Sequence, residues 1–125
     1  FLGIRFRRHC IPDKSDAAIV APSPHYRSLP MSLSVVATIT AKPEFRTEVR
    51  QALDLIVPPS RAEAGCLQYD LHITRDKPDS FVMIERWEDD ATLDRHMATA
   101  HFAALVAAID GKVTGVDIVR LDLVS

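Results

Sequence analysis

Apolar residues recur with a regular period only from residue 31 onward. Residues 33–41, LSVVATITA, are rich in Val, Ile and Thr, which is typical of a β-strand. In the next stretch apolar side chains follow a 3.6-residue period, which predicts a helix with one buried face. These side chains are Phe45, Val49, Ala52, Leu53 and Ile56. Pro43 suits the first turn of this helix, and Pro58 and Pro59 are expected to end it.

A short turn and a second strand are expected after the prolines. Residues 60–65, SRAEAG, predict one capped turn of helix, because Ser60 and Glu63 have the spacing of a capping box. Gly65 suits the left-handed position that follows a helix. Residues 66–74 alternate apolar and polar side chains, as expected for a strand.

The remaining chain predicts a hairpin, a second helix and a last strand. Residues 75–80 are expected to form the hairpin turn and residues 81–88 the next strand. Asp89 or Asp90 can cap the helix that follows. Its apolar face carries Leu93, His96, Met97, His101, Leu105 and Ile109. A bend is expected near residues 99–100, Gly111 ends the helix, and residues 113–124 form the last strand.

The element order β-α-β-β-α-β predicts a ferredoxin-like α+β fold, with a four-stranded antiparallel sheet and both helices on one face. The second face of the sheet is also apolar: in residues 81–88, Phe81, Met83 and Trp87 lie opposite Val82 and Ile84. Leaving an apolar face in water is costly and promotes association. We therefore expect a homodimer in which two sheets pack face to face.

Residues 1–30 show no sustained period and contain four prolines. They carry a net charge of +3, whereas residues 31–125 carry −5. Met31 resembles an initiator. We expect residues 1–30 to be an irregular upstream extension or a vector-derived arm, and residues 31–125 to form the folded domain. The alternative is a functional arm that wraps a neighbouring subunit.

Composition narrows the function classes. The net charge of −2 does not point to nucleic acid or to a membrane surface as a partner. No apolar run approaches the roughly 20 residues that a membrane-spanning helix needs, and no secretory signal is recognisable. Cys10 and Cys66 are too few for a disulfide framework, so a reducing cytoplasm is expected.

Three titratable residues occupy positions where the pattern predicts core: Glu85 on a strand, and His96 and His101 on the following helix. A neutral imidazole is an effective general base near pH 7, and a carboxylate on one ring nitrogen raises the basicity of the other. We expect Glu85 to support His96, with either histidine as the base. The alternative is that all three are hydrogen-bonded core residues.

A metal site is not expected from these residues. The two histidines are five residues apart, roughly 140° around a helix, whereas helical metal pairs prefer a spacing of four. No cysteine or second carboxylate is in register with them. Two aromatic residues are candidate walls of a site: Trp87 could stack on a flat substrate, and Tyr69 could donate a hydrogen bond to a substrate oxygen, although both could be ordinary core residues.

The motifs SRAEAGCLQYDL and FVMIERWEDDATLDRHMATAHF resemble the antibiotic biosynthesis monooxygenase domain, which belongs to the dimeric α+β barrel group. The resemblance covers residues 31–125. The residues that carry it are Glu63, Gly65, Cys66, Tyr69, Glu85, Trp87, Asp90, His96, His101 and Phe102. It implies a ligand pocket between sheet and helices in each subunit, and Met83 and Phe102 are expected to contact the ligand with Trp87 and Tyr69.

The resemblance also implies an activity. Members oxygenate quinols or polyketide aromatics without metal or flavin, degrade haem, or isomerise small phosphorylated sugars. Haem-degrading relatives have an Asn on the first strand and a haem-ligating His after the Phe, and both are missing here. The leading hypothesis is therefore a cofactor-independent monooxygenase that acts on a quinol or related phenol with O2. The alternatives are an acid–base isomerase of a small metabolite and a non-catalytic ligand-binding or stress-associated dimer.

Overall fold

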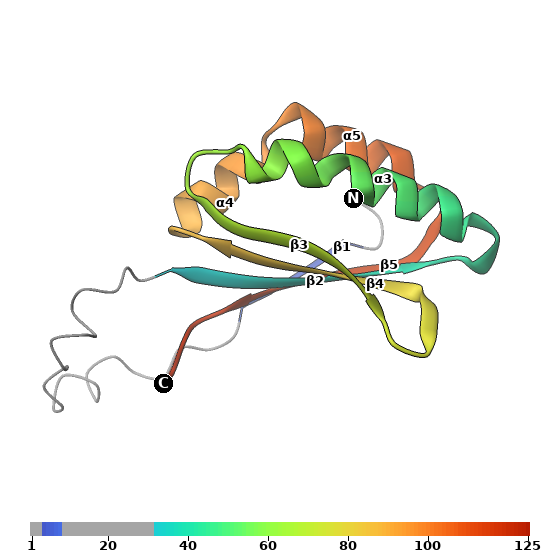
Figure 1. Cartoon of the computed structure of the whole chain (residues 1–125), viewed down its shortest axis with the longest axis horizontal. Coiled ribbons are helices and arrows are strands. Elements are labelled where there is room, and N and C mark those ends of the chain that lie inside the picture. The colour runs from blue at the N-terminus through green and yellow to red at the C-terminus, as the bar shows by residue number, and fades with distance from the viewer. Residues whose placement is uncertain (1–3, 9–31) are drawn as a thin grey trace, which may run out of the picture.

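The computed structural model describes residues 32–125, and residues 4–8 as backbone only. Four antiparallel strands lie in the order β5-β2-β4-β3, and three α-helices cover one face of the sheet (Figure 1). The strands are β2 (Leu33–Ala41), β3 (Cys66–Thr74), β4 (Lys77–Trp87) and β5 (Val113–Leu121). The helices are η1 (Pro43–Phe45), α3 (Arg46–Arg61), α4 (Asp90–Met97) and α5 (Ala100–Ile109). The predicted ferredoxin-like α+β fold is confirmed.

A fifth strand, β1 (Ile4–Arg8), pairs parallel with β5 at the edge of the sheet. It lies in the segment that we expected to be irregular, and five residues are too short for a hydrophobic period to stand out. The rest of that segment, including Cys10, lies outside the described residues. In the part of the chain that the structure describes, no helix is long and apolar enough to span a bilayer.

The prediction that Pro58 and Pro59 end the first helix is wrong. Helix α3 continues through both prolines to Arg61, so residues 60–65 do not form a separate capped turn. Proline removes the backbone hydrogen bond to the carbonyl four residues earlier. The two carbonyls concerned belong to Asp54 and Leu55, which lie on the exposed side of the helix, where water can bind them.

The hairpin between β3 and β4 is tighter than expected. Its turn is only Arg75–Asp76, with Asp76 at a φ of 68°, and β4 already begins at Lys77. A second irregularity lies at the other end of β3, where the register shifts between Cys66 and Gln68. Because of this bulge, Cys66 and Tyr69 lie on the same face of the sheet, where Cys66 pairs with Trp87 and Tyr69 with Glu85 of β4. Leu67 is exposed. The last strand ends at Leu121 rather than at residue 124.

The expected bend in the second helix is a complete break. Asp89 caps α4 by accepting hydrogen bonds from the backbone N–H and the hydroxyl of Thr92, at 2.8 and 2.6 Å. Thr99 caps α5 by accepting a hydrogen bond from the backbone N–H of Phe102. The break turns α5 relative to α4, so His96 and His101 are not held on one continuous helix.

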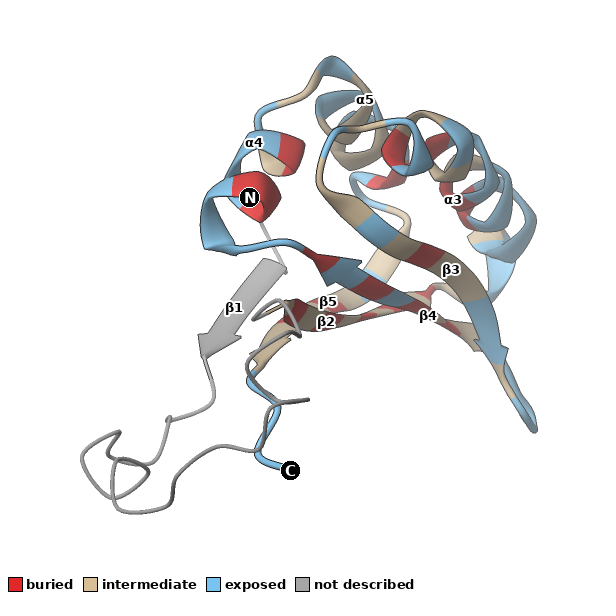
Figure 2. Ribbon diagram, turned by 60° about the vertical axis from the view of Figure 1, so that its left-hand side comes forward, coloured by how far each residue is buried: buried red, intermediate tan, exposed pale blue. Residues whose placement is uncertain are grey.

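The core lies between the sheet and the helices (Figure 2). Alternate residues of β2 face it along the whole strand, as do Phe81, Met83, Glu85 and Trp87 of β4. The opposite face carries a second set of apolar side chains that are only partly covered or exposed. These are Val36, Val82, Ile84, Val119 and Leu121.

Candidate active site

One carboxylate joins the two histidines. Oε2 of Glu63 lies 2.6 Å from Nδ1 of His96 and 2.7 Å from Nε2 of His101. Glu63 comes from the turn between α3 and β3, His96 from the last turn of α4 and His101 from the first turn of α5. The cluster therefore forms where two connections of the fold, α3–β3 and α4–α5, meet above the sheet.

His96 is enclosed by aromatic rings. Its centroid lies 4.7 Å from that of Trp87, 5.3 Å from that of Tyr69 and 5.4 Å from that of Phe102. On its other side, Nε2 lies 3.5 Å from the hydroxyl of Tyr69. The side chain of His96 is 2% exposed, whereas those of Glu63 and His101 are 15% and 26% exposed. His96 is thus the fixed member of the cluster, and the other two are reachable from the surface.

The expected pair of Glu85 and His96 is not formed. Glu85 instead accepts a hydrogen bond of 2.9 Å from the indole N–H of Trp87, two residues along the same face of β4. The partner of His96 is Glu63, which the sequence analysis placed in a capping box with Ser60. Only a backbone hydrogen bond joins Glu63 to Ser60, so the Glu63 side chain is available to the histidines.

The protonation states follow from these contacts. Burial lowers the pKa of His96, although the hydrogen bond and charge of Glu63 oppose this effect. His96 is therefore neutral near pH 7, and a proton on Nδ1 that is donated to Glu63 leaves the lone pair of Nε2 facing Tyr69. Burial and, to a smaller extent, the charge of Glu63 raise the pKa of Glu85 to about 8, although its bond from Trp87 opposes the shift.

Two further groups beside the cluster are held in their neutral forms. Burial raises the pKa of the Tyr69 phenol, and the Glu85 carboxylate adds to the effect. Burial raises the pKa of the Cys66 thiol to about 11, so this free cysteine is not a thiolate at neutral pH.

Gly65 sets the position of the Glu63 turn. Its φ is +87°, as expected from the sequence, and its carbonyl accepts a hydrogen bond of 3.0 Å from the N–H of Glu88. A Cβ at this residue would lie 2.5 Å from the side chain of Thr92 in α4. Only glycine allows the turn to approach α4 this closely, and this approach brings Glu63 to His96.

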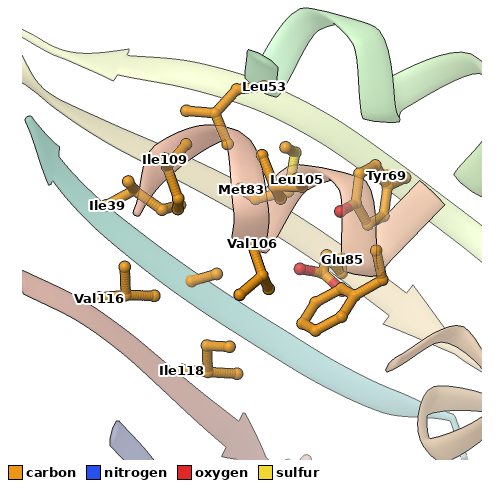
Figure 3. A pocket seen from close by; sticks show the side chains of 12 residues that line it. Ile39, Leu53, Tyr69, Met83, Glu85, Leu105, Val106, Ile109, Val116 and Ile118 are labelled. Carbon is orange, nitrogen blue, oxygen red and sulfur yellow. The ribbon is translucent and has the colours of Figure 1, made fainter. Parts of the chain in front are cut away.

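A small cavity of about 40 Å³ lies beside the cluster, between α3, α5 and the sheet (Figure 3). Its walls are almost entirely apolar, and Tyr69 and Glu85 are the polar side chains among its lining residues. They are cross-strand neighbours on β3 and β4. The lining residues include Met83 and Phe102 but not Trp87, His96 or His101.

The predicted site residues therefore divide into two sets. Tyr69, Met83, Glu85 and Phe102 line the cavity, whereas His96 and His101 lie beside it. Trp87 is fully buried beneath His96, so it is not available as a cavity wall on which a substrate could stack. Tyr69 and Phe102 touch both the cavity and His96, and of these two only Tyr69 carries a polar group, whose oxygen lies 3.5 Å from Nε2 of His96.

Comparison with known proteins agrees with this architecture. The sequence profile of the antibiotic biosynthesis monooxygenase family matches residues 32–108. The chain belongs to this family. The Bacillus subtilis protein named "Putative monooxygenase YcnE" is similar to this chain, with 40% identity over 88 residues, which is 70% of this chain and 93% of YcnE. An Escherichia coli relative named "Probable quinol monooxygenase YgiN" is 34% identical over 96 residues, covering 69% of this chain and 92% of its own length.

Several solved structures share the fold. PA3566 from Pseudomonas aeruginosa superposes with a TM-score of 0.73 at 43% identity, and the match covers 76% of this chain and 96% of PA3566. A crystal structure described as an antibiotic biosynthesis monooxygenase has a TM-score of 0.71 at 38% identity, covering 74% of this chain and 99% of its own. The family and these relatives support a monooxygenase function in general terms.

Proposed function

We propose that this protein is a cofactor-independent monooxygenase that oxidises a small, uncharged hydroquinone or related phenol with O2. The observation that carries this proposal is the position of Tyr69, which borders an apolar cavity on one side and reaches the His96–Glu63 pair on the other. Family membership supports the reaction class, and the name of the Escherichia coli relative mentions a quinol.

The first step is removal of a phenolic proton. His96 does not border the cavity, so its effect on the substrate passes through Tyr69. The Tyr69 hydroxyl gives its proton to Nε2 of His96 and takes the substrate proton in the same movement. The resulting imidazolium is stabilised by Glu63 at 2.6 Å. The distance of 3.5 Å between Tyr69 and His96 must shorten when substrate binds, as is common for catalytic hydrogen bonds.

The phenolate then supplies the electrons. It transfers one electron to O2, and the phenoxyl radical and superoxide combine at a ring carbon that bears hydrogen. Protonation gives a hydroperoxide, which loses water to leave a new carbonyl. For hydroquinone the balance is one substrate and one O2 to one hydroxyquinone and one water. The protein contributes deprotonation, orientation and exclusion of bulk water.

The cavity indicates the substrate class. No Lys, Arg or His is among its lining residues, so a charged substrate would lose its hydration without gaining a counter-ion. Glu85, protonated near neutral pH, can donate a hydrogen bond to a substrate oxygen. The volume of about 40 Å³ is smaller than the roughly 150 Å³ of an apolar cavity that holds benzene, so a single ring already requires the walls to move. These features disfavour an isomerase of phosphorylated sugars.

We further propose that the working form is a homodimer. The support is the face of the sheet away from the helices, where Val36, Val82 and Val119 are only partly covered and Ile84 is 37% exposed. A second copy of this face would bury them. Light scattering after size exclusion tests this proposal. Ile84→Arg should shift the protein to monomers, and a monomeric wild-type protein would contradict it.

The catalytic proposal is tested with an oxygen electrode and single-ring hydroquinones. The full chain should consume one O2 for each hydroxyquinone formed, without added metal or flavin. His96→Asn should lower turnover by about 10²–10⁴-fold. His72→Asn, on an exposed position of β3, should leave turnover unchanged. Equal rates in wild type and His96→Asn would overturn the assignment of His96, and proton exchange on the substrate without O2 uptake would favour the isomerase.

A further inference from the structure

His101 has no part in the proton path described above, yet it binds the same oxygen as His96. Oε2 of Glu63 lies between Nδ1 of His96 at 2.6 Å and Nε2 of His101 at 2.7 Å. The three side chains offer one donor atom each, and these atoms all lie within 4.8 Å of one another. Donors from three separate elements thus converge on one small volume.

Two imidazole nitrogens and one carboxylate oxygen are the donor set of many sites for Zn²⁺ and other divalent first-row metals. From the sequence a metal site was not expected, because the two histidines did not share a helical face and no cysteine or second carboxylate was in register with them. The structure removes both objections. The break between α4 and α5 changes the direction of the His101 side chain, and the turn before β3 places Glu63 beside it.

We propose that Glu63, His96 and His101 bind one divalent first-row transition-metal ion. The ligand atoms would be Oε2 of Glu63, Nδ1 of His96 and Nε2 of His101, with water in a fourth position. This inference goes beyond the proposed function and does not depend on it. Metal binding and the proposed proton transfer exclude each other, because a neutral imidazole that binds metal through Nδ1 carries its proton on Nε2. His96 could then not accept a proton from Tyr69.

The geometry requires a modest opening of the cluster. Ligands of a tetrahedral Zn²⁺ with bonds of about 2.0–2.1 Å lie about 3.3 Å apart, so each histidine–glutamate distance must increase by about 0.6–0.7 Å. The two histidine nitrogens, which lie within 4.8 Å of each other, must take the same spacing. His96 is fixed among aromatic rings. Glu63 and His101 are partly exposed, at 15% and 26%, and Glu63 lies in a turn. These two side chains have room to withdraw, and their exposure provides the entry path.

The test is a calorimetric titration of the full, chelator-treated chain with Zn²⁺ at pH 7.5, without substrate. We expect one ion per chain, and at least about tenfold weaker binding by His101→Asn. The matched controls are His9→Asn, His25→Asn and His72→Asn, which should bind as the wild type does. Circular dichroism verifies that each variant is folded. Because His101 is partly exposed, its replacement should be tolerated.

A second measurement keeps the result decisive if a variant fails to fold. Co²⁺ added to the wild-type chain should give the visible absorption of a tetrahedral or five-coordinate ion, and Zn²⁺ should displace it. The proposal is overturned if the wild type binds no ion at up to about 1 mM, or if His101→Asn binds as tightly as the wild type. It is also overturned if a control histidine carries the binding. Turnover of hydroquinone is measured separately on metal-free protein, so failure of either proposal is distinguishable.

Discussion

The hydroxyl of Tyr69 lies 3.5 Å from Nε2 of His96, and Tyr69 borders the apolar cavity whereas His96 does not. In the proposed mechanism, this relationship makes Tyr69 the contact to substrate and His96 the proton acceptor behind it. Glu63, bonded to Nδ1 of His96, orients the ring and supports its charge. The order from the cavity outward is therefore Tyr69, His96 and Glu63.

Replacement of Tyr69 by Phe should separate binding from turnover. The ring that packs against His96 remains, but the hydroxyl that passes the proton is lost. We expect kcat to fall by about 10²-fold or more while KM changes little, because apolar side chains form most of the cavity wall and Glu85 remains in it. Met83→Leu, which conserves volume in the same cavity, should lower kcat far less. A wild-type kcat in Tyr69→Phe would exclude the proton path through the phenol.

Glu63→Gln should weaken the base without removing it. The hydrogen bond and charge of Glu63 raise the pKa of His96 against the dominant effect of burial, so the variant should have a still lower His96 pKa. The acidic limb of the pH profile of kcat/KM should therefore move to lower pH, and the plateau rate should fall by about 10–100-fold. Glu44→Gln, on an exposed residue of η1, is the control. An unmoved acidic limb would contradict the coupling.

Glu85 should make stability depend on pH. Its pKa is about 8 in the folded protein against 4.5 as the ordinary value, so the folded state binds more protons between these two values. The free energy of unfolding is therefore highest below about pH 4.5 as far as Glu85 is concerned, and this contribution is lost as the pH rises to about 8. The groups that interact with Glu85 include Tyr69 and Cys66 on β3, Trp87 on β4 and the more distant Glu63.

Urea unfolding of Glu85→Gln against wild type checks this dependence. The difference in the free energy of unfolding should grow in favour of the variant between pH 6 and pH 8.5, because glutamine cannot ionise in the unfolded chain. Glu88→Gln, at an exposed residue just beyond the same strand, should show no such trend. A constant difference between Glu85→Gln and wild type would mean that Glu85 is ionised in the folded protein.

Gly65→Ala should cost more than the same change at Gly111. Both glycines have positive φ, 87° and 75°, so each alanine carries a backbone cost of about 1–2 kcal/mol. Only at Gly65 would the new Cβ meet another side chain, that of Thr92, whereas Gly111 has open space. The added steric conflict should cost about 1–3 kcal/mol more in the free energy of unfolding. Equal costs at the two glycines would refute the close approach.

Local chain preferences identified the fold well because they act over short distances. The β-branched run of β2, the apolar period of α3 and the Asp89 cap all depend on neighbours within a few residues. The effect of Pro58 and Pro59 was not predictable from the sequence, because it depends on whether the carbonyls that they leave unbonded face water. That condition is set by how α3 lies on the sheet.

The candidate site was only half predictable from sequence. His96, His101, Tyr69 and Glu85 stand out as polar groups in apolar patterns, and each was named. Glu63 was named as a capping-box residue and as part of the family motif but not as the partner of His96, because in the sequence it is an ordinary charged residue near a helix end.

The sequence by itself determined the order of the elements from β2 to β5, the core face of these strands apart from the bulge at Cys66, and the presence of imidazole and carboxyl groups inside the fold, since periodicity and composition encode them directly. Only the tertiary structure decided their partners. Glu63 and His96 are 33 residues apart, and the left-handed turn at Gly65 and its packing on Thr92 bring them within 2.6 Å. Hydrogen bonds form between groups that are close in space, and distance along the chain does not report that closeness.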